Sequence, residues 1–300
     1  MVERDLRVAG TIWVVGCLVG LAASSPLAAQ NSRIPSPVNE NPLRPRGQNV
    51  IPVYDGWFEN SDGSYTLCFG YFNLNTEASL DIALGPENRI EPSQYDGMQP
   101  THFDPVPAPT LTVRYRHQWC VFSVTVPDDF GTGDIVWTLT SQGDELAATG
   151  SLVPVYILDE PISIGRAAVA PFLSLEENGP ELQGRRGLWS GPRTVRANEP
   201  LPLTAWIEHA EPGTWLGWTK HQGPGEVTFA EPEIRLDVAE GPATTTASFS
   251  QPGNYVVRVQ AINDTESSRN PTYGFEFHCC WTNGYVPVTV APREGASDRD

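Results

Sequence analysis

The segment Thr244–Asp264 constrains the fold of this chain more than any other. Apolar and polar residues alternate on both sides of a central turn sequence, Gln251–Asn254. Period-two alternation is typical of half-buried antiparallel strands, and Pro-Gly between two such runs is turn chemistry. The second run, Tyr255–Ala261, directs its apolar residues to one face and leaves Arg258 and Gln260 on the other. The pattern predicts a β-hairpin whose polar side chains point outward.

The same segment resembles the closing strands of PKD-type and related immunoglobulin-like β-sandwich modules of secreted bacterial proteins. Comparable alternation occurs at Leu201–Ile207, in Trp215–Thr219 and at Val286–Val290. The chain departs from that pattern at Lys220–Gly225 and in an insertion, Glu266–Thr282. The resemblance implies an immunoglobulin-like sandwich over residues 200–292, and it brings no ligand or partner with it.

The N-terminal half also reads as a succession of strands. An Asp-Gly turn within Asn60–Ser64 separates two aromatic runs, which is a strong hairpin signal. The sequences Gly56–Asn75, Asp96–Pro107 and Val126–Gly131 resemble an N-terminal module of uncharacterised exported bacterial proteins, for which no activity is implied. No amphipathic helical stretch of useful length occurs. We therefore expect an all-β chain of two tandem immunoglobulin-like antiparallel β-sandwich domains.

Composition marks the borders of these units. Residues 30–49 are rich in proline, lack aromatic residues and are expected to form a tether. The two sandwiches are expected at residues 50–157 and 200–292, separated by a linker at 158–199 and followed by a disordered tail at 293–300. A long Pro/Gly/Asn-rich excursion, Ile82–Pro109, is a candidate functional loop.

The first residues predict export. A weakly basic start, an apolar run at Val8–Ala23 and small residues at Pro26–Ala29 are typical of a signal peptide, here residues 1–29. The mature chain is then expected to lack a transmembrane segment and to be periplasmic, on the outer surface or extracellular. As a minor alternative, Val14–Cys17 resembles a lipoprotein box with Cys17 as the lipidated residue.

Charge limits the class of partner. The formal net charge is −17 at pH 7, and removal of residues 1–29 leaves it unchanged because two acidic and two basic residues go together. An acidic chain repels nucleic acid phosphates, and no basic stripe occurs in the sequence. The expected partners are therefore not nucleic acids.

Four cysteines remain after the signal peptide, and an even number in an exported chain predicts disulfides. Four cysteines allow three pairings, of which Cys68–Cys120 with Cys279–Cys280 is the simplest because it needs no link between domains. Neighbouring α-carbons lie about 3.8 Å apart, closer than an ordinary disulfide requires, so a Cys279–Cys280 bond needs a local backbone distortion. Whether that bond forms stays open.

No catalytic signature occurs in the sequence. A nucleophile elbow, a His-Glu-x-x-His zinc motif, a phosphate-binding loop and a dinucleotide fingerprint are all missing. Acid pairs such as Asp128-Asp129 and Glu176-Glu177 are commonplace. We therefore expect no enzyme activity, no catalytic residues and no cofactor.

Metal binding has two weak candidates. The His278–Cys280 run lacks the spacing of two to four residues that zinc ligands usually have. Asn60, Asp62 and Ser64 present oxygens at alternate positions, as calcium loops do, but the Asp-Gly turn already accounts for them. We predict no metal site, and calcium binding stays open.

Tryptophans are the remaining candidates for a binding surface. Trp137 and Trp218 are in phase with apolar neighbours and are expected in the cores. Trp206, Trp215 and Trp281 are out of phase or lie in an insertion, and are expected to be exposed for partner binding.

These observations favour a non-enzymatic, exported binding or structural protein of the bacterial envelope or extracellular space. Its expected partner is a protein or polysaccharide of the envelope, and exposed strand edges also allow self-association. The alternative is a secreted hydrolase or its accessory carbohydrate-binding module, with Ile82–Pro109 forming a cleft over the first sheet.

Overall fold

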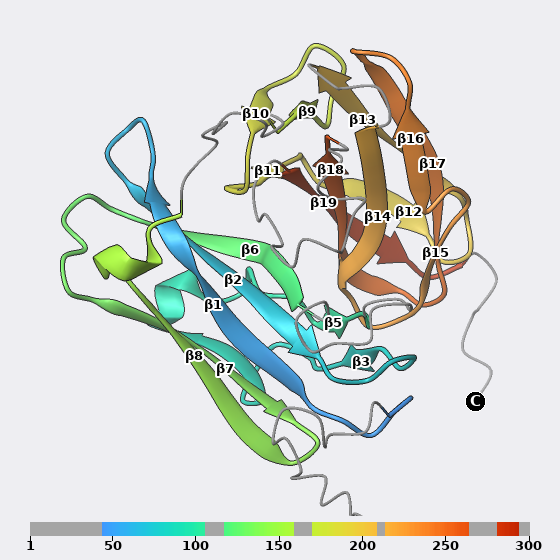
Figure 1. The fold of residues 1–300 in the computed structure, drawn as a ribbon. Coiled ribbons are helices and arrows are strands. Elements are labelled where there is room, and N and C mark those ends of the chain that lie inside the picture. The colour runs from blue at the N-terminus through green and yellow to red at the C-terminus, as the bar shows by residue number, and fades with distance from the viewer. Residues whose placement is uncertain (1–43, 106–116, 159–169, 209–213, 264–280, 294–300) are drawn as a thin grey trace, which may run out of the picture. The chain divides into compact units, whose positions relative to one another are not determined.

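The computed structural model describes residues 44–105, 117–158, 170–208, 214–263 and 281–293. The regular structure of these residues is almost entirely β-strand, with two short 3-10 turns, η1 (Ser93–Tyr95) and η3 (Pro154–Tyr156). Within the described ranges, no helix has the length and apolar character needed to cross a membrane. The prediction of an all-β chain is confirmed (Figure 1).

The N-terminal sandwich consists of two three-stranded antiparallel sheets and a two-stranded pair. One sheet contains β1 (Val50–Glu59), β2 (Tyr65–Asn73) and β6 (His117–Val126), the other β4 (Asn88–Glu91), β7 (Asp134–Ser141) and β8 (Asp144–Ser151), and the pair β3 (Leu80–Asp81) and β5 (His102–Phe103). Their facing side chains form one core that includes Phe69, Phe122 and Trp137. The core position predicted for Trp137 is confirmed, since its side chain is fully buried.

The first hairpin turns where the Asp-Gly sequence predicts it. Gly63 has a φ of +84°, and its N–H donates to the Asn60 carbonyl. Asp62 Oδ1 accepts hydrogen bonds from the backbone N–H and the hydroxyl of Ser64. The turn uses these oxygens to hold its own backbone, as such Asx turns do.

A bulge in β6 decides where Cys120 points. Cys120 and Phe122 are two residues apart, so a regular strand would place both side chains on one face, but the structure does not. Cys120 has a φ of +40°, and the pairing of β2 with β6 shifts register between Phe69 and Tyr71. Three residues of β6, 119–121, stand opposite the single residue Gly70 of β2, and such an irregularity changes the face of the residues within it. Phe122 therefore lies in the sandwich core, whereas Cys120 packs with Cys68 in a separate cluster.

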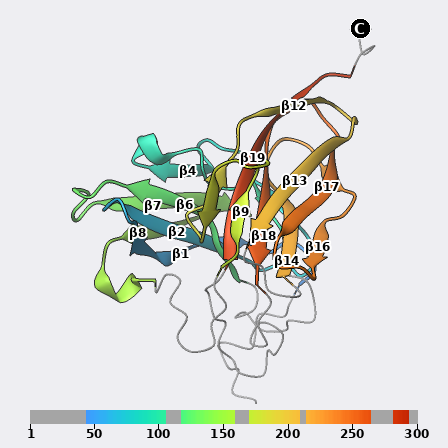
Figure 2. The same cartoon turned by 90° about the horizontal axis from the view of Figure 1, so that it is seen from above.

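The C-terminal sandwich is immunoglobulin-like, as the resemblance implies. The β13 sheet has the order β10 (Glu181–Gln183), β9 (Phe172–Ser174), β13 (Leu201–Glu208), β17 (Gly241–Phe249) and β15 (Val227–Phe229). The β18 sheet has the order β11 (Leu188–Trp189), β19 (Trp281–Ala291), β18 (Gly253–Ile262), β14 (Thr214–Gln222) and β16 (Glu233–Leu236), and β12 (Arg193–Arg196) also pairs with β19. Figure 2 shows the strands of both sheets from above. Alternating residues of the two sheets form a shared core.

Part of the predicted linker belongs to this sandwich. Residues 158–199 were expected to connect the domains, but β9 and β10 extend the β13 sheet and β11 and β12 pair in parallel with β19. These strands are two to four residues long, too short to show a clear alternation in the sequence. The expectation of a linker is corrected for Phe172–Arg196.

The outer face of the β18 sheet is covered by the N-terminal sandwich. Tyr285 Oη donates to the carbonyl of Val121 at 2.7 Å, and Asn283 Nδ2 donates to the carbonyl of Cys120 at 3.0 Å. The side chain of Arg258 reaches the same Val121 carbonyl at 3.4 Å. The carbonyls at the β6 bulge thus gain partners from the second sandwich, and described residues from 44 onward belong to one compact unit.

Asp55 and His117 form a buried ion pair close to this contact. Their Oδ1 and Nε2 atoms lie 2.9 Å apart, off hydrogen-bond alignment, and each side chain is at most 3% exposed. Burial raises the pKa of Asp55, although His117, the Cys120 N–H and Arg185 partly oppose this. Gly70 makes room for the pair, because a Cβ there would collide with the Asp55 carboxylate.

A second polar cluster joins β3 and β5 to β14. His102 bridges two carboxylates, with Nδ1 2.8 Å from Asp81 and Nε2 2.9 Å from Asp104. Lys220 of β14 contacts Asp81 at 2.9 Å. Burial lowers the pKa of His102, but the two carboxylates outweigh it and raise the pKa to about 9.

Candidate functional site

Strand register places Trp206 on the outer face of the β13 sheet. Leu203, Ala205 and Ile207 point into the core, so Trp206 and Glu208 point outward. Across the sheet, Ser174 pairs with both Trp206 and Glu181. Directly opposed residues of neighbouring strands share a face, so these three side chains form one row across β13, β9 and β10.

A second row lies two residues further along the same face. Phe172 of β9 pairs with Glu208 of β13 and with Gln183 of β10. Residues two apart on a strand point the same way, so Phe172 and Glu208 flank the row that contains Trp206. The face combines two aromatic rings with carboxylates from two strands, β10 and β13, and from the β9–β10 turn.

The β9–β10 turn fixes two further carboxylates beside this face. The hydroxyl of Ser174 donates to the Glu176 carbonyl at 2.7 Å, and the Gly179 N–H donates to the same carbonyl at 3.0 Å. Asn178 has a φ of +56°, a left-handed conformation that asparagine tolerates better than most residues. The turn therefore presents Glu176 and Glu177 next to the strand that carries Trp206.

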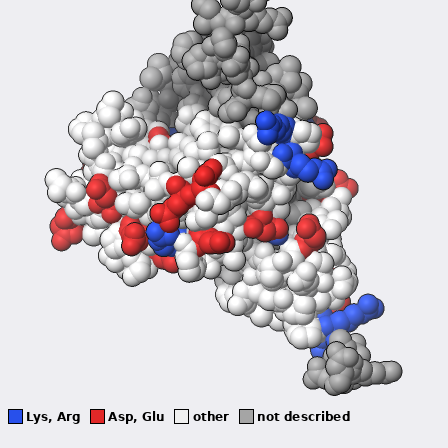
Figure 3. Space-filling view, turned by 90° about the horizontal axis from the view of Figure 1, so that it is seen from below, with Lys and Arg blue, Asp and Glu red and all other residues white. Residues whose placement is uncertain are grey.

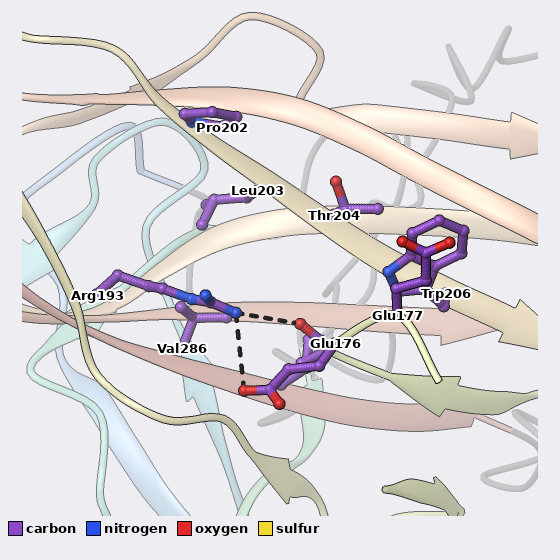
Figure 4. A pocket seen from close by; sticks show the side chains of 9 residues that line it. Glu176, Glu177, Arg193, Pro202, Leu203, Thr204, Trp206 and Val286 are labelled. Carbon is purple, nitrogen blue, oxygen red and sulfur yellow. Dashed lines mark hydrogen bonds and ion pairs between the residues drawn. The ribbon is translucent and has the colours of Figure 1, made fainter. Parts of the chain in front are cut away.

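Trp206 lines two cavities, and we call them together the Trp206 groove. The larger has a volume of about 490 Å³. Its lining combines apolar and polar side chains: Leu175, Glu176, Glu177, Arg193, Pro202, Leu203, Thr204, Trp206 and Val286. Arg193 of β12 connects two of the lining residues of this cavity. One of its guanidinium nitrogens lies 3.4 Å from the Leu175 carbonyl and 4.0 Å from the Glu176 carboxylate (Figure 4).

The smaller cavity has a volume of about 170 Å³ and shares Trp206 and Glu177 with the larger. Its lining residues are Phe172, Ser174, Glu177, Asn178, Glu181, Trp206 and Glu208. Ligand sites usually measure about 300–1,000 Å³, so the larger cavity has the size of a small-ligand site and the smaller has room for a single group.

The three tryptophans that the sequence predicts to be exposed differ in their surroundings. Trp206 is half-buried and lines both cavities. Trp215 is half-buried on β14, in the β18 sheet, and lines neither. The expectation that Trp281 is exposed is wrong: it is 6% exposed, packs beside the two cysteines and lies 5.3 Å from the Arg185 guanidinium. The insertion that contains it returns as β19 against the N-terminal sandwich.

The sequence missed most of the groove around Trp206. The sequence shows Glu176 and Glu177 only as a commonplace acid pair. The predicted linker, residues 158–199, contains Arg193, Glu181 and Phe172. The one signal was Trp206 itself, an aromatic residue in the outward phase of a clear strand.

The other predicted sites have mixed outcomes. The Cys68–Cys120 disulfide is confirmed, with α-carbons 4.9 Å apart. His278, Cys279 and Cys280 lie outside the described residues, as do the signal peptide with Cys17, residues 30–43 of the tether and residues 294–300 of the tail. Among the described residues, no group of three or more His, Cys, Asp or Glu side chains is arranged to hold a metal ion.

The surface is acidic on the face drawn in Figure 3. Red carboxylate side chains are spread over that face, with blue basic side chains between them. This agrees with the net charge of −17. A partner that approaches this face therefore meets carboxylates over much of it.

No family model and no curated protein matches the sequence. Among solved structures, the PKD domain of human KIAA0319 is 18% identical, over 47% of this chain and 100% of that one, with a TM-score of 0.24. The D00-D0 domain of intimin is 12% identical, over 80% of this chain and 99% of that one, with a TM-score of 0.25. A protein of unknown function from Porphyromonas gingivalis W83 is 12% identical, over 80% and 98%, with a TM-score of 0.26. At these identities and scores, none of the three transfers an activity, a ligand or a partner to this chain.

Proposed function

We propose that this chain is an exported, non-enzymatic binding protein that engages a protein or polysaccharide of the cell envelope through the Trp206 groove. One observation carries the proposal: a half-buried tryptophan lines two cavities whose other lining residues include several polar side chains. A flat aromatic ring supplies contact area, and a few convergent polar groups supply orientation.

Export is supported by the disulfide. Cys68 and Cys120 are joined and almost completely buried. Disulfides form and persist in oxidising compartments, which include the periplasm and the cell exterior. The periplasm, the outer surface and the extracellular space are all compatible with the proposal, and lipidation at Cys17 stays the minor alternative.

The hydrolase alternative depended on Ile82–Pro109 forming a cleft. The described part of that segment instead packs against β14. Gln222 Nε2 donates to the carbonyls of Gly97 and Gln99, and the Thr101 N–H donates to the His221 carbonyl. Binding at the groove is therefore the better supported function, and a carbohydrate-binding accessory role is one form of it.

Self-association through the β10 edge of the β13 sheet is a weaker candidate. The edge strand β10 is only three residues long, and short edge strands offer few groups to an added strand. A second copy would also bring the same net charge of −17. Repulsion between two acidic copies opposes close contact.

A pull-down from the producing organism's envelope extract tests the proposal. The bait is Gln30–Asp300, beside the variants Trp206→Ala and Trp215→Ala, and the eluates are analysed for protein and for sugar. We expect wild type and Trp215→Ala to retain the same protein or glycan and Trp206→Ala to lose it. Retention that survives Trp206→Ala and disappears with Trp215→Ala contradicts the groove as the binding site. A parallel run with a chelator tests the open question of calcium.

A further inference from the structure

The smaller cavity of the Trp206 groove has an unusual lining. Two of its side chains are aromatic, Phe172 and Trp206, and three are carboxylates, Glu177, Glu181 and Glu208. No lysine, arginine or histidine is present among the described residues that line it. The arrangement offers a π surface and negative charge to the same small volume.

The carboxylates come from separate parts of the chain. Glu181 lies on β10, Glu208 on β13 and Glu177 in the β9–β10 turn, while Ser174 of β9 lies between the two strands. The nearby Arg193 belongs to the larger cavity, where Glu176 contacts it. That ion pair therefore involves none of the three carboxylates that line the smaller cavity.

A cation is the group that fits such a lining. Aromatic faces attract lysine and arginine side chains, and carboxylates form charge-assisted hydrogen bonds with both. The volume of about 170 Å³ suits one side chain and not an extended ligand. Metal ions are a poorer fit, since no described cluster of carboxylates is close enough to coordinate one.

We propose that the smaller cavity seats a lysine or arginine side chain of a protein partner, held against Trp206 by Glu177, Glu181 and Glu208. This inference rests on the proposed function and specifies the chemistry of its ligand. An acidic polysaccharide is repelled by the same carboxylates, and a second copy of this chain carries a net charge of −17. A basic protein segment is the partner with complementary charge.

Binding of a hexalysine peptide with blocked ends tests the inference. It is titrated at about 0.15 M salt, where the Debye length of about 8 Å suppresses distant charges. The proteins are wild-type Gln30–Asp300, the double variant Glu181→Gln/Glu208→Gln and the matched control Asp128→Asn/Asp129→Asn. Both variants remove two exposed carboxylates, and the control removes them from the N-terminal sandwich.

We expect the Glu181→Gln/Glu208→Gln variant to bind the peptide about tenfold more weakly and the Asp128→Asn/Asp129→Asn control to bind within about twofold of wild type. Trp206→Ala should weaken binding comparably, and a peptide with acetylated lysines should not bind. Equal weakening by the control, or equal binding of the acetylated peptide, overturns the inference because overall charge or backbone contacts then suffice.

The two proposals fail in distinguishable ways. If neither hexalysine nor hexaarginine binds wild type while the envelope pull-down still depends on Trp206, the smaller cavity does not bind a basic side chain. The proposed binding function then stands. If the pull-down does not depend on Trp206 either, both are wrong.

Discussion

The two outer faces of the C-terminal sandwich look alike in the sequence and differ in the structure. Arg258 of β18 and Trp206 of β13 both occupy the outward phase of an alternating strand. Arg258 is 7% exposed and contacts the N-terminal sandwich, whereas Trp206 lines a groove. Alternation identifies the inner face of a sheet, but the outer face can meet either solvent or another domain. Stability should therefore depend on the β18 face and binding on the β13 face.

The largest expected loss of stability comes from the pair beside the covered β18 face. His117→Leu should lower the free energy of unfolding by about 3–5 kcal/mol, because the buried Asp55 carboxylate loses its partner at Oδ1 and keeps only the Cys120 N–H at Oδ2. Urea unfolding followed by circular dichroism measures the loss. The Asp55→Leu/His117→Leu double variant is the control and should recover part of it. A single variant as stable as wild type would show that the pair contributes little to the fold.

The pH dependence of stability tests the cluster that joins β3 and β5 to β14. The folded-state pKa of His102 is raised to about 9 from 6.5, so the folded chain binds the proton more tightly than the unfolded chain. The resulting stability is fully present below pH 6.5 and is lost as the pH rises toward 9. A rise of the His102 pKa from 6.5 to about 9 corresponds to at most about 3–4 kcal/mol of stability, and solvent at the half-exposed Asp81 and Asp104 reduces this value.

Urea unfolding between pH 6.5 and 9.5 measures how the free energy of unfolding falls with rising pH. His102→Gln should make this slope smaller. The carboxylates of Asp81 and Asp104 change stability with pH in the opposite direction to His102. The pKa values of Asp81 and Asp104 are held below their usual range mainly by His102, against the effect of burial, so their contribution is lost as the pH falls. A slope that persists unchanged in His102→Gln would assign it to another group.

A smaller effect is expected from one hydroxyl on the covered β18 face. Tyr285→Phe removes the 2.7 Å hydrogen bond to Val121 and should cost about 1 kcal/mol. The cost stays low because Arg258 also reaches the Val121 carbonyl. Tyr156→Phe, at a tyrosine that is 47% exposed, is the matched control and should have no measurable effect. Equal losses of stability in both variants would mean that the hydrogen bond from Tyr285 to Val121 does not account for the loss in Tyr285→Phe.

The sequence could predict the inner faces of both sandwiches. Tyr255, Val257 and Val259 are buried as their alternation indicates, and the Asp-Gly turn forms the expected hairpin. The Cys68–Cys120 pairing followed from counting cysteines per half of the chain. Each of these features depends on residues that are close in sequence or few in number, which is where a pattern has predictive value.

The groove and the β6 bulge could not be predicted in the same way. Glu181 and Trp206 become neighbours only through the pairing of β9 with two strands, and strands of three residues are too short to show a period. The bulge at Cys120 changes the register of β2 and β6 without any change in composition. The expectation for Trp281 was wrong for a related reason, since nothing in the residues around it indicates that the N-terminal sandwich packs against them.

The smallest effect on stability is expected on the β13 face, at Trp206. Its ring is half-exposed and no described residue from the N-terminal sandwich lines the cavities around it. Trp206→Ala should therefore change the free energy of unfolding by about 1 kcal/mol or less while removing the proposed binding. Urea unfolding of this variant, set beside the envelope pull-down, separates the two readouts. A loss of several kcal/mol would instead make Trp206 a structural residue, and the difference between the two faces would no longer correspond to a difference between folding and function.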